Sequence, residues 1–284
     1  MFFIHKPRQA PSSKQRRHAS ISYGELQYLA AGRSGTIYAI DEKRILKEYH
    51  ERTEGDVERL AYERLGSHPN IARYLGSTKD GSIILERGQV LRSVCQKIGA
   101  AQTPLQKKLR WVRDAAEGIK HAHGKNIVQA DCSCNNMILT RSGDLKIIDF
   151  EGCSIDGAQA GSQYEWFSYR RSTPLVSFQT DIFAFGCAIF EIMTGTTPYN
   201  ELEKFTNRSS LVEQLYRENQ FPDVTHLPLG DLMQQCWNGT FTSMNDIIHS
   251  LDADRTARSK ANVEGVIYRV LKQLVCRTNR REHG

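Results

Sequence analysis

The chain has 284 residues, of which 39% are hydrophobic and 25% are charged. This composition is that of an ordinary globular protein, long enough for one large domain or for two lobes that share a cleft. It excludes a small protein that depends on disulfides or structural metals, because a chain of this length can bury a sizeable core without them.

The net charge of +6 is unevenly distributed. Residues 1–20 carry five basic side chains and no acidic ones, and residues 255–284 carry eight basic and two acidic ones. The intervening part is therefore slightly acidic. We expect the basic ends to be solvated tails, with residues 1–20 disordered, and we disfavour nucleic acid as a partner.

Three features predict an intracellular protein. The stretch Met1–Ile4 is too short for the apolar core of a signal peptide, and no apolar run reaches the roughly 18 residues of a membrane span. Seven cysteines, an odd number, indicate free thiols in a reducing compartment. We therefore expect a cytoplasmic protein, with the nucleus as the alternative, and no membrane partner.

The first third of the sequence predicts a small sheet with one helix. A glycine-rich turn, Gly32–Gly35, separates the first two apolar runs. The helix is expected from Asp56 to Leu65, and Gly66 is a favourable residue to end it. Strands are expected at residues 26–29, 36–40, 44–49 and 82–86, with more strand opening at 68–71.

The rest of the sequence is predicted to be mainly helical. Thr103 is a good N-cap and Pro104 a good first-turn residue for a helix that Gly124 ends. Residues 181–194 are apolar on nearly every side, as in a helix buried within a lobe. An amphipathic helix over residues 261–276 offers an apolar face to a binding partner.

The signal with the most chemical content lies between residues 127 and 150. Asn136 follows Asp131 by five residues, and Asp149 follows Asp131 by 18 residues in an apolar setting. Phosphoryl transfer needs this set of side chains. Asp131 would orient an acceptor hydroxyl and take its proton, while Asn136 and Asp149 would hold Mg²⁺ on the phosphates.

Weaker signals precede this segment. A glycine-rich turn lets backbone N–H groups approach phosphates, because no Cβ atom intervenes. Lys47, in a following strand, could reach phosphate oxygens, and Glu58, on the next helix, could hold that lysine. Taken singly, these features are more often a plain hairpin turn, a strand lysine and a surface glutamate.

Together the motifs resemble those of a protein kinase, and the catalytic loop looks most similar to small divergent kinase-like proteins of filamentous fungi. Later segments extend the resemblance to the helical end of that family. These segments are Asp181–Gly186, Glu191–Tyr199 and Cys236-Trp237.

The resemblance implies an α+β, two-lobed fold. A small, β-rich N-lobe with one helix would comprise residues 21–88, and a larger, mainly helical C-lobe would comprise residues 89–252. The protein kinase domain would thus cover residues 21–252, between the basic tail at 1–20 and a basic helical extension at 253–284.

The resemblance also implies a nucleotide site with ATP and Mg²⁺ as cofactors and proteins as substrates. Lys47, Glu58 and Asp131 are the implied catalytic residues. Asn136 and Asp149 are the implied metal ligands. The implied ATP-binding residues are Gly32, Gly35, Ile37, Lys47, Leu85, Glu86 and Ile138.

The sequence departs from the family pattern at several points. Gln129-Ala130 replaces a His-Arg pair whose arginine grips an activation-segment phosphate, so switching by that phosphate is not expected. Glu151 replaces the glycine of D-F-G, and it either stiffens the segment or adds a carboxylate near the metal. Ser133 stands where many serine/threonine kinases have a lysine, and no A-P-E motif follows.

Three functions remain open on these grounds. The retained Lys47, Asp131, Asn136 and Asp149 favour an active kinase that phosphorylates Ser or Thr in proteins. The departures favour a pseudokinase that acts as a nucleotide-binding scaffold. The compact N-lobe and basic tail favour a kinase of small molecules or of tRNA processing.

Overall fold

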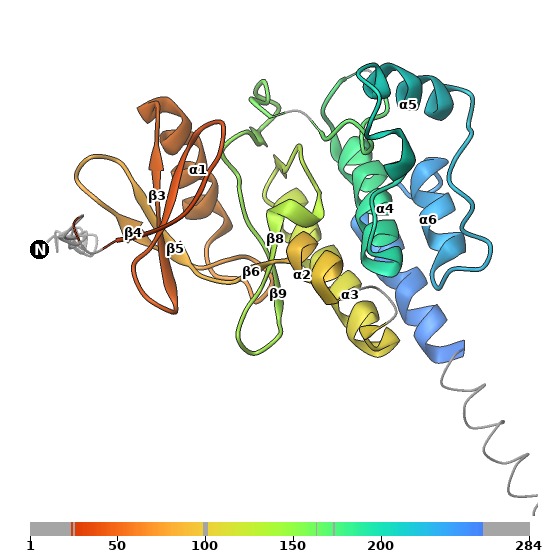
Figure 1. The fold of residues 1–284 in the computed structure, drawn as a ribbon, viewed down its shortest axis with the longest axis horizontal. Coiled ribbons are helices and arrows are strands. Elements are labelled where there is room, and N and C mark those ends of the chain that lie inside the picture. Colours follow the sequence, from red (N-terminus) through yellow and green to blue (C-terminus); the bar gives the residue numbers. More distant parts are fainter. Residues whose placement is uncertain (1–23, 25, 99–101, 163, 173, 258–284) are drawn as a thin grey trace, which may run out of the picture.

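The computed structural model describes residue 24 and residues 26–98, 102–162, 164–172 and 174–257. This part of the chain forms a β-rich lobe and a mainly helical lobe side by side (Figure 1). The α+β, two-lobed fold expected from the sequence is confirmed. The predicted tail at 1–20 and the predicted helix at 261–276 lie outside the described residues.

The N-lobe is a five-stranded antiparallel sheet in the order β1-β2-β3-β5-β4. Its register places Ile37 opposite Lys47, and Ile45 opposite Leu85. Because side chains alternate between the faces of a strand, Ile45 and Lys47 project from the same face. The strands are β1 (Gln27–Ala31), β2 (Gly35–Ala39), β3 (Arg44–Tyr49), β4 (Tyr74–Ser77) and β5 (Ile83–Glu86).

The helix of this lobe, α1 (Arg52–Leu65), begins four residues before the predicted Asp56. Gly55 lies in its first turns, and glycine is a poor helix former. The ring of Tyr49 explains its presence, because a Cβ atom on Gly55 would lie 2.6 Å from that ring. The predicted C-cap is confirmed, since the N–H of Gly66 donates to the Tyr62 carbonyl.

The prediction that a strand begins within residues 68–71 was wrong. Only Ile71 makes a bridge, to Ile147, and β4 begins at Tyr74. The loop instead joins the two lobes. The side-chain amide of Asn70 donates to the Leu145 carbonyl at 3.1 Å, and the N–H of Ile147 donates to the Asn70 carbonyl at 2.9 Å.

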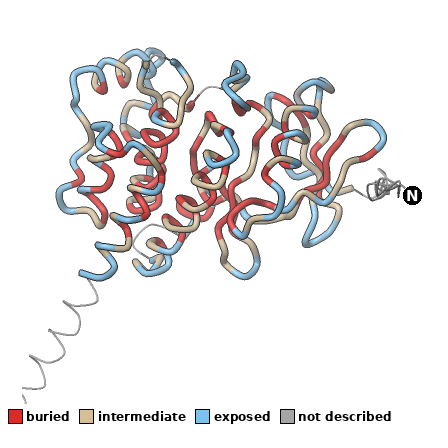
Figure 2. The backbone as a smooth tube through the Cα atoms, turned by 180° about the vertical axis from the view of Figure 1, so that it is seen from behind, coloured by how far each residue is buried: buried red, intermediate tan, exposed pale blue. Residues whose placement is uncertain are grey.

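The C-lobe is built around α4 (Phe178–Thr194), which is buried along most of its length, as predicted for residues 181–194. Ser177 and Thr180 form a reciprocal capping box at its start, and Gly195 ends it in the left-handed conformation. Figure 2 shows the buried stretches running through the interior of both lobes, with exposed stretches at the loops.

Three other C-lobe helices, over residues 91–98, 105–123 and 230–237, pack against α4. Helix α3 ends before Gly124 as predicted, but Pro104, and not Thr103, occupies the N-cap position, without a side-chain cap. The remaining helices are α2 (Leu91–Ile98), α3 (Leu105–His123), α5 (Arg208–Arg217), α6 (Gly230–Trp237) and a last helix described over residues 244–257. No helix among the described residues is long and apolar enough to cross a bilayer.

Two short sheets carry the loops with the candidate catalytic residues, and the strands of one of them, β6, β8 and β9, lie between the N-lobe and the C-lobe helices (Figure 1). In one, β6 pairs with β8 and β8 with β9; in the other, β7 pairs with β10. These strands are β6 (Gln89–Val90), β7 (Ile127–Val128), β8 (Met137–Leu139), β9 (Leu145–Ile147) and β10 (Ser154–Ile155).

Candidate active site

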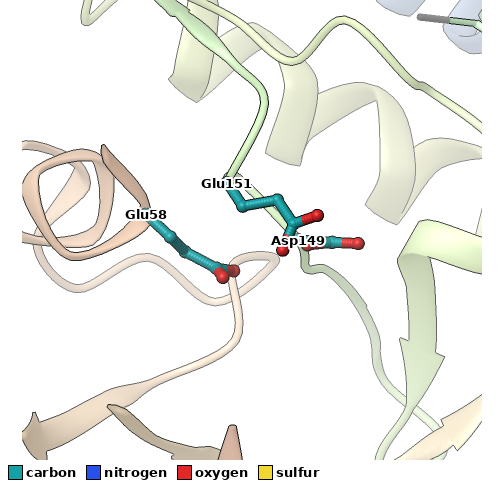
Figure 3. Close-up of side chains that lie close together, drawn as sticks. All are labelled: Glu58, Asp149 and Glu151. Carbon is teal, nitrogen blue, oxygen red and sulfur yellow. The ribbon is translucent and has the colours of Figure 1, made fainter. Parts of the chain in front are cut away.

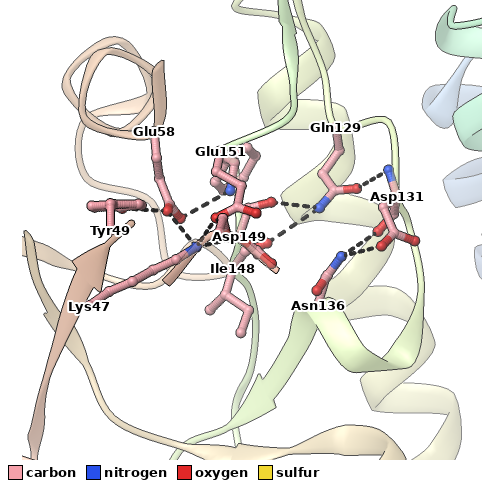
Figure 4. A network of polar contacts seen from close by, with 11 residues as sticks. Lys47, Tyr49, Glu58, Gln129, Asp131, Asn136, Ile148, Asp149 and Glu151 are labelled. Atoms are coloured by element: carbon pink, nitrogen blue, oxygen red, sulfur yellow. Dashed lines mark hydrogen bonds and ion pairs between the residues drawn. The ribbon is translucent and has the colours of Figure 1, made fainter. Parts of the chain in front are cut away.

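The buried ammonium group of Lys47 on β3 contacts three carboxylates. Its Nζ lies 2.7 Å from Glu58, 2.6 Å from Asp149 and 2.7 Å from Glu151 (Figure 4). Burial alone would lower the pKa of Lys47, but the negative charges of these carboxylates outweigh it and raise the pKa well above its usual value. Lys47 is therefore a permanent cation in this site.

Glu58 on α1 is fully buried and is held by more than Lys47. The Tyr49 hydroxyl donates to Glu58 Oε2 at 2.6 Å, and the backbone N–H of Phe150 donates to Oε1 at 3.1 Å. Phe150 itself packs edge-on against Tyr62 of α1, with ring centroids 5.3 Å apart. These contacts tie α1 to the segment that carries Asp149.

The catalytic-loop candidates lie across the cleft from Lys47. The side-chain amide of Asn136 donates to Asp131 Oδ2 at 2.8 Å and to the Asp131 carbonyl at 3.0 Å. The other carboxylate oxygen of Asp131, Oδ1, is buried and has no hydrogen-bond partner among the described residues. An unpartnered buried acceptor of this kind suits a ligand that brings its own donor, such as a hydroxyl group.

The backbone of this loop is held by Asp181 of α4, which is fully buried. Its carboxylate accepts from the N–H groups of Gln129 at 2.8 Å and Ala130 at 3.0 Å. His123 lies 2.9 Å from the same carboxylate. The support is needed because Ala130 has a φ of 66°, a conformation that is costly for a residue other than glycine.

Two adjoining pockets open between the lobes. The first, with a volume of about 310 Å³, is predominantly apolar, and the structure brings the predicted Leu85, Glu86 and Ile138 to it. Ile45 also lines it. The Glu86 side chain is engaged elsewhere, by Lys146 at 3.2 Å and Arg73 at 3.4 Å. Any contact with a bound base would therefore come from its backbone.

The second pocket is more polar and has a volume of about 280 Å³. The glycine-rich turn forms one wall, and the catalytic loop and metal motif form the others. Among the residues lining it are Gly32, Gly35, Ile37, Lys47, Asp131, Asn136 and Asp149. Every residue predicted to bind ATP or metal, or to act in catalysis, therefore lines one of these two pockets.

Asp149 and Asn136 fit a divalent cation. Ligand oxygens of Glu58, Asp149 and Glu151 lie within 4.8 Å of one another (Figure 3). The ammonium group of Lys47 contacts all three carboxylates. Glu58 and Glu151 therefore act as its counter-ions, and Asp149 is the carboxylate that would also bind the cation. Asn136 adds an amide oxygen on the wall of the same pocket. Oxygen donors of these types are the ligands that Mg²⁺ prefers.

A family model described as protein tyrosine and serine/threonine kinase matches residues 43–249, well over half of the chain. The chain belongs to the protein kinase superfamily. The match includes Lys47 of the N-lobe and nearly all of the described C-lobe.

Three curated relatives illustrate the kinship. Mitogen-activated protein kinase kinase kinase 3 of Arabidopsis thaliana is 27% identical over 68% of this chain, and the RAF proto-oncogene serine/threonine-protein kinase of Xenopus laevis is 25% identical over 70%. Serine/threonine-protein kinase STY46 of Arabidopsis thaliana is 24% identical over 87%. The aligned regions cover 33%, 34% and 44% of these relatives, so the chain spans less than half of their length.

The kinase domain replaces the lost family motifs with other contacts. Gln129, at the histidine position, donates from Nε2 to the carbonyls of Ile148 at 3.3 Å and Asp149 at 3.1 Å. Its Oε1 accepts from the N–H of Asp131 at 2.6 Å. One amide thus bridges the catalytic loop and the metal motif, because it carries both donors and an acceptor. From the sequence, Gln129 was interpreted only as the loss of the family's histidine.

The segment that follows the metal motif also has its own anchors. Arg64 of α1 lies 2.6 Å from Asp156, and the N–H of Asp156 donates to the Asn126 carbonyl at 2.9 Å. Farther along, Arg170 donates to the carbonyl of Trp237 at the end of α6 at 3.0 Å. These contacts fix the described parts of this segment to α1, to the loop at Asn126 and to α6.

Proposed function

We propose that this kinase domain transfers the γ-phosphate of Mg-ATP to Ser or Thr hydroxyls of protein substrates. The observation that carries the proposal is that Lys47, Asp131, Asn136 and Asp149 line one polar pocket beside a mainly apolar one. The names of two relatives, both serine/threonine-protein kinases, support the choice of acceptor.

Each side chain has a role that its contacts support. The apolar pocket would bind adenine. Lys47 would bind phosphate oxygens, with its position fixed by Glu58. Asn136 and Asp149 would hold Mg²⁺, which would neutralise charge on the phosphates. Asp131 would accept the proton of the acceptor hydroxyl on its unpartnered Oδ1.

Asp131 is suited to that proton transfer. Burial, and after it the nearby carboxylates of Glu165 and Asp149, raise its pKa from an ordinary acidic value to about 7. A general base is most effective when its pKa lies near the working pH, because it is then both available and basic enough.

A second function is favoured by one specific observation. Glu151 contacts Lys47 at 2.7 Å and receives a hydrogen bond from Ser34 of the glycine-rich turn. A carboxylate in this place hinders phosphate binding, as would be expected in a pseudokinase that acts as a scaffold. Transfer to small molecules or in tRNA processing remains a prediction without an added observation.

The domain bounds, the cellular location and the binding partners are also proposals. We place the domain at residues 21–252 and its action inside the cell, in the cytoplasm or the nucleus. We also propose the resemblance to small divergent kinase-like proteins of filamentous fungi, a partner for the helix at 261–276, and no membrane or nucleic-acid partner.

The decisive experiment measures transfer of labelled γ-phosphate from Mg-ATP to the protein itself and to a generic basic protein. Transfer that is lost in Asp131→Asn and in Asp149→Asn supports the active kinase. Absence of transfer, with a Mg-ATP thermal shift that Lys47→Met abolishes, supports the pseudokinase. Absence of both transfer and shift would overturn the nucleotide site.

A further inference from the structure

The ammonium group of Lys47 has three N–H donors. Three carboxylates, those of Glu58, Asp149 and Glu151, lie within 2.7 Å of its nitrogen, one for each donor. A phosphate oxygen can therefore bond to Lys47 only if one of these carboxylates leaves.

The three carboxylates are not equally easy to displace. Glu58 is fully buried and also accepts from Tyr49 and from the N–H of Phe150. Asp149 has its backbone held by the Gln129 amide, and under the proposed function its carboxylate binds the cation. Exposure does not decide between Asp149, whose side chain is 34% exposed, and Glu151, whose side chain is 14% exposed. Glu151 differs in that its other hydrogen bond comes from the hydroxyl of Ser34, on the turn that would cover the phosphates. Glu151 is therefore the carboxylate that would leave.

Glu151 also joins two walls of the phosphate pocket. Its backbone belongs to the metal motif, whereas Ser34 lies 117 residues earlier, on the turn that would cover the phosphates. Arg33 of the same turn donates to the carbonyl of Gly161 at 3.2 Å. This is a second contact between the turn and the segment that follows Asp149. The two contacts draw the turn down onto the segment that follows Asp149.

We infer that Glu151 is a built-in competitor of the nucleotide phosphates. In the nucleotide-free protein its carboxylate takes a donor of Lys47 and the hydroxyl of Ser34, and both contacts break when phosphates enter. This inference rests on the proposed function, namely that the cleft binds ATP. The family has glycine at this position, which offers no side chain for such a contact, so this form of self-inhibition is a property of this chain.

The test compares ATP affinity of the full chain by calorimetry, once with MgCl₂ and once with EDTA. Glu151→Gln keeps the size of the side chain and removes its charge, and Glu151→Gly restores the family residue. Both are expected to bind ATP at least about tenfold more tightly under both conditions, because a charge-assisted hydrogen bond no longer opposes binding. Ser34→Ala removes the hydrogen bond from Ser34 to Glu151 but leaves the ion pair between Glu151 and Lys47. It should therefore tighten ATP binding only a few-fold.

The matched control is Asp156→Asn. It removes one negative charge from the same segment, but Asp156 pairs with Arg64 and does not contact Lys47, so its affinity should equal that of the wild type. Hydrogen exchange gives a second readout: residues 32–35 should exchange faster in nucleotide-free Glu151→Gln than in the wild type.

The contrary outcomes are distinct. Unchanged or weaker binding by both Glu151 variants under both conditions would overturn the competitor role. Binding weakened only with MgCl₂ would overturn it as well and would make Glu151 a cation ligand. Failure of every protein, wild type included, to bind ATP would overturn the proposed nucleotide site itself.

Discussion

The side chain of Gln129 reaches across to Asp149, 20 residues later, and donates to its backbone carbonyl at 3.1 Å. Asp149 has a φ of 64°, so its backbone is held in a conformation that most residues avoid. The same Gln129 amide accepts from the N–H of Asp131. This one side chain therefore sets the spacing between the candidate base and the candidate cation ligand.

Replacing Gln129 by Ala should lower kcat by about 10- to 100-fold, since it leaves buried backbone groups of both loops without their partner. Gln129→His, which restores the family residue, should keep more activity than Gln129→Ala, because an imidazole also offers a donor or an acceptor. Steady-state kinetics with Mg-ATP check this. Equal kcat values for the wild type and the Ala variant would show that the bridge is dispensable.

Tyr49→Phe should weaken ATP binding several-fold, with a smaller effect on kcat. The substitution removes the hydroxyl that donates to Glu58 at 2.6 Å, and Glu58 in turn positions Lys47. Tyr38→Phe is the matched control, because Tyr38 lies on the neighbouring strand β2 and does not line either pocket. The measurement is KM for ATP beside kcat. An equal change in both variants would contradict a specific role for Tyr49.

Asp181→Asn should destabilise the fold by about 2 kcal/mol or more. The carboxylate accepts hydrogen bonds from the N–H groups of Gln129 and Ala130 and from the Tyr164 hydroxyl. In the Asp181→Asn variant, one of the two accepting oxygens becomes an NH₂ group, which cannot accept from these donors. Asp231→Asn, at the exposed start of α6, is the control and should change stability by less than about 1 kcal/mol. Urea unfolding monitored by circular dichroism measures both, and similar midpoints for the two variants would argue against the anchor.

The loop between the lobes should lose stability at acidic pH through His68. Burial and the neighbouring His121 lower the pKa of His68, and its Nδ1 accepts from the N–H of Asn70 at 3.2 Å. The neutral ring is therefore favoured in the folded protein. Its stabilising contribution is present above the unfolded pKa of roughly 6.5 and is lost as pH falls through the lower folded value.

This dependence can be isolated with His68→Gln. Urea midpoints are measured at pH 7.5 and pH 5.5 for the wild type and the variant. The wild type should lose more stability between these two pH values than His68→Gln does. A loss of the same size in both proteins would assign the acid sensitivity to other groups.

The sequence alone predicted several features whose signal is local. Asp131 and Asn136 lie on one loop, five residues apart, and the sequence assigned both to the same site; in the structure they are in contact at 2.8 Å. The alternation of apolar residues predicted β2, β3 and β5 close to their final bounds. Helix α2 was missed, although its buried Leu91, Val94 and Cys95 follow helical spacing and could have revealed it.

Only the tertiary structure decided how segments far apart in the chain meet. Glu151 was recognised in the sequence as a departure, but its contacts with Lys47 and Ser34 depend on how the two lobes pack. The bridging role of Gln129 depends on the same packing. Periodicity and spacing record the local geometry of one helix, strand or loop, whereas these contacts are fixed by burial and hydrogen bonding between elements. The residues of the site could therefore be named from the sequence, and their electrostatic balance could not.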